Sequence, residues 1–210
     1  MLNALANTSD HLNNAEPISA HPEKIKEQME DNNAIIYDID NKAEAFDTVR
    51  KAAEDVIDKA ANKNDPAIKD MKKKLDKLNN LWVQIKNATK DRSDSLRDAL
   101  TLAENFWSAL QQVLSSIRDI ETNLVSQEPP AVEPKEIKAQ TAELKNIMKD
   151  IENTKPGVDN CLKTGKDLMN IVGEPEKPEL KQHIDELNDA WENITALYAK
   201  RESNLLVPEL

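Results

Sequence analysis

The chain has 210 residues, of which 39% are hydrophobic, 32% are charged and only 3 are glycines, and its formal net charge is -11. This composition is typical of long helices that each bury one narrow apolar stripe, and it disfavours a compact domain with a broad aromatic core. The negative charge argues against nucleic acid, an anionic membrane surface or the acidic surface of a microtubule as a direct partner.

The first third of the chain predicts a short helix, a loop and a long helix. Residues 1–14 carry leucines at helical spacing, and residues 15–21 form a loop. Pro22 suits the first turn of a helix, where its missing N–H is not needed. From Ile25 to Ala60 apolar residues recur every three or four positions, which predicts a helix over residues 22–62.

The stretch from Pro66 to Glu128 predicts one unbroken helix. Asp65 can cap its start, and no proline or glycine occurs between Pro66 and Pro129. A periodic apolar pattern of this length indicates a coiled coil, a membrane span or a helical repeat. Charged residues throughout the stretch exclude a membrane span.

Two further helices follow. Prolines between Glu128 and Pro134 end the long helix, and the apolar pattern then continues over residues 134–172. Pro156 and Gly157 fall inside that pattern, so we expect a kink or local break there within a single helix. A loop at residues 173–178 precedes a last helix over residues 178–206.

The chain contains an internal repeat of about 110 residues. Residues 16–28 (EPISAHPEKIKEQ) resemble residues 128–140 (EPPAVEPKEIKAQ), and residues 75–96 resemble residues 184–205, with Trp82 matching Trp191. Because neighbouring helices with short loops pack antiparallel, each copy predicts a three-helix bundle. We expect an all-α fold of two antiparallel three-helix coiled-coil bundles, joined by a continuous shared helix into an elongated rod. The first bundle would span residues 1–91, with an N-terminally truncated first helix (1–14, 22–62, 66–91), and the second would span residues 92–206 (92–127, 134–172, 178–206).

These features resemble tandem spectrin repeats. In that family a tryptophan of the third helix is followed ten residues later by a basic residue and then by a leucine. Trp82, Arg92 and Leu96 match this pattern, as do the corresponding residues of the second copy, which are Trp191, Arg201 and Leu205. The segments EPPAVEP (128–134) and GEPEKP (173–178) make the chain most similar to the spectraplakin rod, in the group of microtubule-actin cross-linking factor, dystonin and Short stop.

The resemblance implies a cytoplasmic, cytoskeletal protein with actin-binding and microtubule-binding ends, and a spacer role for this segment between them. The alternative is a docking module that binds a specific cytoskeletal or adhesion protein through a helix face or the junction between repeats. We expect protein partners and possible self-association, with no nucleic acid and no membrane insertion. The single cysteine fits a reducing compartment, and no secretion signal or membrane span is expected.

The sequence predicts no catalytic, cofactor or metal site. His11, His21 and His183 lie far apart, which is typical of surface histidines. Asp38 and Asp40 begin like a calcium loop, but the required glycine and glutamate are missing. With 3 glycines there is no phosphate-binding loop.

A few residues are nevertheless assigned roles. Cys161 lies near an apolar stripe and is expected to be a buried small hydrophobe. Trp82, Trp191, Arg92 and Arg201 are interpreted as structural core anchors, the arginines either paired or reaching the surface. Phe106 and Trp107 are neighbours, so one of them must point away from the main seam. We expect that residue to pack at the junction between the bundles or to contact a partner, and Arg92 to help fix the junction.

Overall fold

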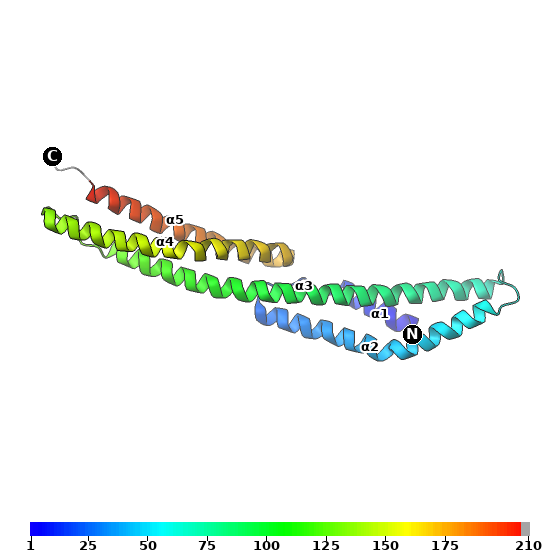
Figure 1. Cartoon of the computed structure of the whole chain (residues 1–210). Coiled ribbons are helices and arrows are strands. Elements are labelled where there is room, and N and C mark those ends of the chain that lie inside the picture. Colours follow the sequence, from blue (N-terminus) through cyan, green and yellow to red (C-terminus); the bar gives the residue numbers. More distant parts are fainter. Residues whose placement is uncertain (207–210) are drawn as a thin grey trace. The chain divides into compact units, whose positions relative to one another are not determined.

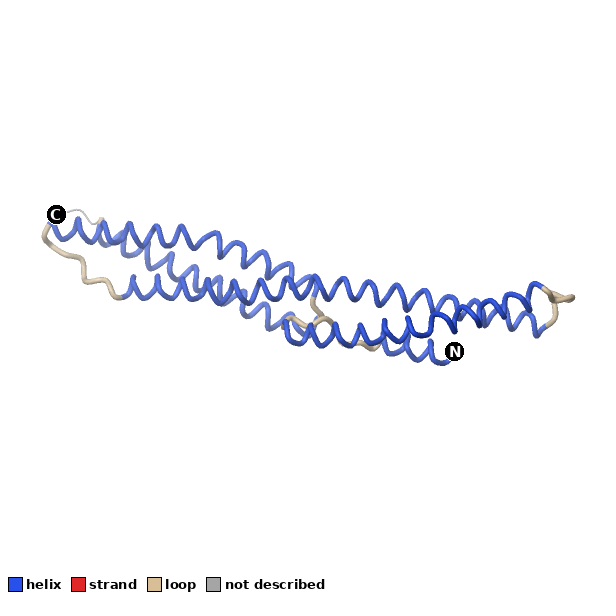
Figure 2. The backbone as a smooth tube through the Cα atoms, turned by 60° about the horizontal axis from the view of Figure 1, so that its bottom comes forward, coloured by secondary structure: helices blue, strands red, loops and turns tan. Residues whose placement is uncertain are grey.

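A computed structural model describes residues 1–206 as helices joined by short loops, and contains no strand among these residues (Figures 1 and 2). The predicted all-α class is confirmed. The helices in chain order are α1 (Leu2–Asn13), α2 (Pro22–Asp58), α3 (Pro66–Val125), α4 (Pro134–Ile171), the short 3-10 helix η1 (Glu174–Glu176) and α5 (Lys177–Leu205).

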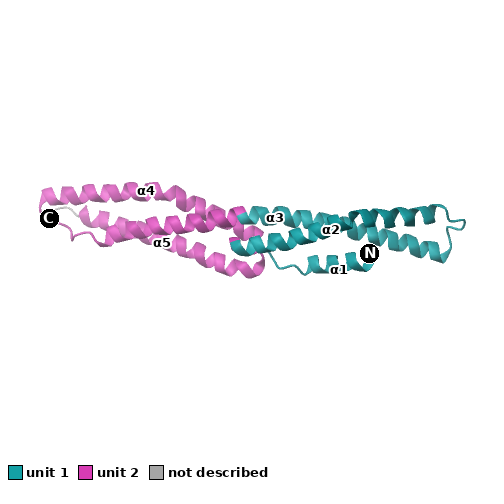
Figure 3. Cartoon of the chain, turned by 90° about the horizontal axis from the view of Figure 1, so that it is seen from below, with its two compact units in different colours: residues 1–18, 23–100 teal, residues 19–22, 101–210 magenta. Residues whose placement is uncertain are grey.

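The chain divides into two compact units, and the division falls inside α3 (Figure 3). Unit 1 comprises Met1–Ile18 and Glu23–Leu100, and unit 2 comprises Ser19–Pro22 and the described residues from Thr101 onward. The predicted boundary between residues 91 and 92 therefore lies roughly two and a half helical turns before the structural one. Leu96 and Ala99, which are fully buried, still group with unit 1.

Unit 1 is a bundle of α1, α2 and the first part of α3. Its apolar core takes residues from all three helices. Trp82 of α3 is 8% exposed and stacks on Phe46 of α2, with ring centroids 4.2 Å apart. Such an aromatic pair adds about 0.5–1.5 kcal/mol beyond the area it buries. The other buried members of this core are Leu5, Ile39, Leu78 and Ile85.

Unit 2 packs the second part of α3 with α4 and α5. Phe106 of α3 is fully buried, and Gly165 of α4 lies against it. A methyl group on Gly165 would come within 2.8 Å of the Phe106 ring, so the absence of a side chain permits this close approach. The buried apolar residues of α4 and α5 are Leu144, Ile147, Ile151, Val158, Cys161, Leu168, Leu180, Leu187 and Ile194.

The helix ends follow local chemistry and differ slightly from the prediction. At the start of α3 the Ala67 amide donates to Asp65 Oδ1 at 2.9 Å, as expected for a cap. The helix predicted to reach residue 62 ends instead at Asp58. The Lys63 ammonium donates to the carbonyls of Ile57 and Asp58, both at 2.9 Å, and so helps to satisfy the last carbonyls of this helix.

The helix α4 continues through Pro156 without a break. The prediction of a single helix in this region is therefore confirmed. The final helix begins at Lys177 and ends at Leu205, one residue from each end of the predicted range.

Candidate functional site

Trp107 lies at the centre of a cluster of polar side chains in unit 2. It is half-buried on α3, and its indole N–H donates to the Ala20 carbonyl at 2.8 Å. The segment Ser19–Pro22, which belongs to unit 2, is thereby held beside the helix. Trp107 also lies beside two histidines: the His21 ring stacks on it with centroids 5.2 Å apart, and the His183 ring meets it edge-on at 4.9 Å.

The position of Trp107 follows from its neighbour. Phe106 fills the core of unit 2, and consecutive residues of a helix point about 100° apart, so Trp107 must face another side of α3. The polar end of an indole needs a hydrogen-bond acceptor when it is partly buried, and Ala20 supplies one. A role of Phe106 and Trp107 at a junction between repeats, or in binding a partner, stays a prediction.

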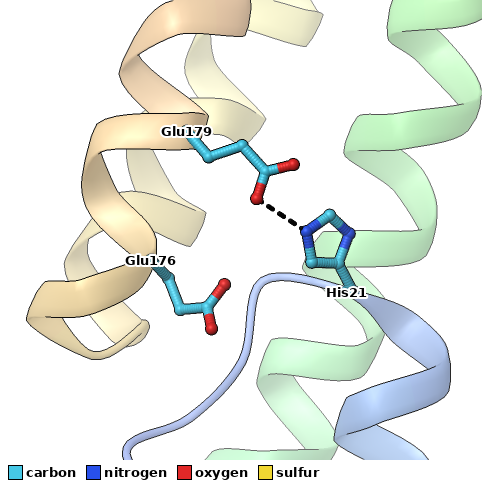
Figure 4. A group of neighbouring side chains, drawn as sticks. All are labelled: His21, Glu176 and Glu179. Carbon is cyan, nitrogen blue, oxygen red and sulfur yellow. Dashed lines mark hydrogen bonds and ion pairs between the residues drawn. The ribbon is translucent and has the colours of Figure 1, made fainter.

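Carboxylates lie close to both histidines; Figure 4 shows His21 with Glu176 and Glu179. His21 Nε2 lies 2.9 Å from Glu179 Oε2, and Glu176 Oε2 accepts a long hydrogen bond of 3.5 Å from the Ala20 amide. His183 lies 4.0 Å from the other oxygen of Glu179 and 3.6 Å from a carboxylate oxygen of Glu186. The ligand atoms of His21, Glu176 and Glu179 all lie within 4.8 Å of one another.

Sequence reasoning missed this cluster. It treated the three histidines as dispersed, whereas the fold places His21 and His183 against one indole; only His11, in unit 1, is separate from them. No spacing rule could reveal the pairing of His21 with Glu179, because the two are 158 residues apart in the chain. The one usable signal was the prediction that either Phe106 or Trp107 points away from the main seam.

The model of the spectrin repeat matches residues 1–98 and again residues 101–206. The chain belongs to the spectrin-repeat family. Among its relatives are microtubule-actin cross-linking factor 1 of rat, with 31% identity over 98% of this chain, and isoforms 6/7 of the same protein from mouse (31%) and human (30%), also over 98%. These matches confirm the resemblance to spectraplakins and support a structural role. The chain spans only 4% of the rat relative and 6% of the other two.

The two spectrin repeats share a hydrogen bond between a glutamine of their second helix and a carbonyl of their first loop. Gln28 Nε2 donates to the Pro17 carbonyl at 2.9 Å, and in the second repeat Gln140 Nε2 donates to the Pro129 carbonyl at 3.0 Å. Each glutamine thus satisfies a loop carbonyl that no helix can pair. Since both positions correspond in the two copies, this bond belongs to the repeat pattern itself.

Arg92 and Arg201, which hold the same position in the motif of the two repeats, have different surroundings. Arg92 Nη2 donates to the Glu16 carbonyl at 2.8 Å in unit 1. In unit 2, Nε and Nη2 of Arg201 are enclosed, and among the described residues they have no hydrogen-bond partner. The predicted roles of both arginines as core anchors remain predictions.

Trp82 and Trp191, the motif tryptophans of the two repeats, also differ: the one in unit 1 is more buried and has a stacking partner. Trp82 is 8% exposed and stacked on Phe46, while Trp191 is only half-buried. When Pro22 is aligned with Pro134, Phe46 corresponds to Val158, so the second repeat has no aromatic residue at that position.

Cys161 is fully buried in unit 2, as expected. Burial raises the pKa of its thiol to about 11, because a thiolate would lose its hydration there. The thiol is therefore neutral at physiological pH and unsuited to nucleophilic chemistry. Within residues 1–206, no helix combines the length and the apolar character needed to cross a membrane.

Proposed function

We propose that this chain is a spacer segment of a cytoskeletal cross-linking protein, connecting ends that bind actin and microtubules or cell junctions. Support comes from the two consecutive spectrin repeats and from relatives named as microtubule-actin cross-linking factors. The proposal places the chain in the cytoplasm, on the cytoskeleton, with a mechanical role and no enzymatic one.

The observation that carries this proposal is the continuity of α3. Its 60 residues contribute buried side chains to both units, among them Trp82 in unit 1 and Phe106 in unit 2. No loop separates the repeats, since the backbone hydrogen bonds of one helix continue through Leu100 and Thr101. A sharp kink in α3, or separation of its two parts, would break some of those bonds, so a shared helix suits a segment that transmits load.

A reconstituted cross-linker tests the proposal. The chain is placed between an actin-binding and a microtubule-binding module, and bundling of the two filaments is compared with that by the same modules joined through another two-repeat spectrin segment. A spacer should support cross-linking equally well in both fusions. The isolated chain should sediment with neither filament, because its net charge of -11 is repelled by both acidic surfaces. Direct filament binding by the isolated chain would contradict a pure spacer.

A second candidate function is docking of an amphipathic helix, and a groove in unit 1 favours it. The groove has a volume of about 350 Å³ and is lined by Val49 and Ala53 of α2, Met71 and Leu75 of α3, and Leu2 at the start of α1. Because α1 already packs on the adjoining surface of the same two helices, a helix in line with α1 would continue that contact. Val49 is 43% exposed, so a helix placed there would cover apolar surface.

Substitution of Val49 by lysine separates this second function from the first. It should abolish binding of an amphipathic helix, or reduce self-association measured by light scattering, while the reconstituted cross-linker is unaffected. If Val49→Lys left both kinds of binding unchanged, docking at this groove would be refuted.

A further inference from the structure

The histidine and carboxylate cluster of unit 2 has a composition that a spacer does not require. His21 comes from the loop before α2, Glu176 from η1 and Glu179 from the first turn of α5 (Figure 4). The two glutamates are neighbours in the chain, and the fold brings the imidazole of the distant His21 to them, with all ligand atoms within 4.8 Å of one another.

The distances are close to those of a metal site. Zinc binds imidazole nitrogen and carboxylate oxygen at about 2.0–2.2 Å, so two ligands of one tetrahedral ion lie roughly 3.3 Å apart. His21 Nε2 and Glu179 Oε2 are 2.9 Å apart, and the ligand atom of Glu176 lies within 4.8 Å of both, so the glutamate side chains must rotate to complete the set. Both partners of this pair are about half exposed, at 45% and 47%, so an ion could reach them from solvent.

The backbone around His21 is held in place independently of any ion. Trp107 donates to the carbonyl of Ala20, Ser19 Oγ accepts from the His21 amide at 3.1 Å, and Ser19 and Ala20 are buried. The stacked indole also restricts the His21 ring. Such partners, which position a ligand without touching the metal, are what distinguishes a site from a chance meeting of side chains.

We propose that His21, Glu176 and Glu179 bind a divalent transition-metal ion, with zinc as the ion that best fits one nitrogen and two oxygen ligands. Calcium and magnesium prefer sets of oxygen ligands only, and their affinity here is far lower. Three protein ligands leave a fourth position for water. The bound ion ties the segment Ser19–Pro22 to the start of α5 and stabilises unit 2 by mass action.

Calorimetric titration of the tag-free chain with zinc chloride at pH 7.5 tests the proposal. The wild-type chain should bind one ion per molecule, and His21→Gln and Glu179→Gln should each lower the association constant at least tenfold. His11→Gln, which removes a histidine in unit 1, is the matched control and should change affinity less than twofold. Millimolar magnesium or calcium should not compete.

Nuclear magnetic resonance of the histidine rings gives a second readout that needs no variant. The chain has only 3 histidines, so their ring signals can be assigned. Zinc should shift the His21 resonances at a one-to-one ratio and leave those of His11 unchanged. Absence of saturable one-to-one binding, equal affinity in Glu179→Gln, or shifts at His11 in place of His21 would each overturn the site.

Discussion

Residues 19–22 and residues 131–134 occupy the same place in the two spectrin repeats, between the first and second helices, yet their environments are opposite. Ser19 and Ala20 are 2% and 0% exposed, whereas Val132, which corresponds to Ala20, is 88% exposed. Both loops accept the same hydrogen bond from a glutamine of the second helix. The difference is due to Trp107, whose indole N–H donates a hydrogen bond to the Ala20 carbonyl of the first loop. Trp107 belongs to the second matched repeat, whereas the loop belongs to the first.

The same contrast extends to the pattern tryptophans and arginines. Trp82 and Arg92 of unit 1 have defined partners, while Trp191 is half-buried and Arg201 has two enclosed nitrogens without one among the described residues. A shared motif therefore fixes the position of a residue on its helix. The residues packed around it decide how much that residue contributes to the free energy of unfolding.

Replacing the two tryptophans should show the largest difference between the units. Trp82→Ala should lower the free energy of unfolding by about 3–5 kcal/mol, because it leaves a cavity beside Phe46. Trp191→Ala should cost about half as much, since less of that side chain leaves water on folding. Urea unfolding followed by circular dichroism measures both. Equal losses would show that the stacking of Trp82 on Phe46 makes no extra contribution to the free energy of unfolding.

Cys161 allows the two units to be followed separately. Its thiol lies in unit 2, is fully buried and has a pKa raised to about 11, so a thiol reagent at pH 8 labels only molecules in which unit 2 has opened. The Trp82→Ala substitution should accelerate labelling much less than Trp191→Ala does, provided the units open independently. Similar acceleration by both would reveal strong coupling through α3.

Breaking α3 tests that coupling directly. Asp94 is exposed on α3, and Asp94→Pro removes a backbone hydrogen bond and clashes with the carbonyl of Lys90, at a cost of about 3 kcal/mol or more. Because Asp94 lies in unit 1, the transitions of the two units should then be farther apart than in the wild-type chain, with unit 1 unfolding first. Asp94→Ala is the matched control and should change little. An unfolding curve for Asp94→Pro that coincides with that of the control would mean that an unbroken α3 does not contribute to the stability of the chain.

Two glycines of α4 give a graded pair of smaller effects. Gly165→Ala places a methyl group 2.8 Å from the Phe106 ring, and we expect a loss of about 1–3 kcal/mol from overpacking. Gly157→Ala meets Val113 Cγ2 at 3.2 Å, where the valine can give way, and alanine gains about 1 kcal/mol of helix propensity. Thermal unfolding should show destabilisation in the first variant and near neutrality in the second. The opposite order would contradict the close packing of α3 on α4.

Much of the fold could be predicted from the sequence, because the information is local. The helix start at Pro66, the single helix through Pro156 and the repeat near 110 residues all follow from apolar spacing, prolines and self-comparison. The end of α2 was missed because Lys63 reaches back over the turn to Asp58, a contact that no periodicity encodes. The cluster at Trp107 was missed for a stronger reason: its members are distant in sequence, and only the packed bundle brings them together.

Replacing Arg92 and Arg201 should give the smallest changes in the free energy of unfolding, but the changes should have opposite signs or only one of them should be a loss. Arg92→Met removes the hydrogen bond to the Glu16 carbonyl and should cost about 0.5–1 kcal/mol. Arg201→Met removes two enclosed nitrogens, Nε and Nη2, that have no hydrogen-bond partner among the described residues, and keeps most of the apolar stem. Since an enclosed unpaired donor is itself unfavourable, this variant should be neutral or more stable by up to about 1 kcal/mol. Chemical unfolding of both variants beside the wild-type chain measures the difference. A loss in Arg201→Met as large as that in Arg92→Met would mean that the two arginines contribute equally despite their different surroundings, and the position within the motif would then matter more than the partner.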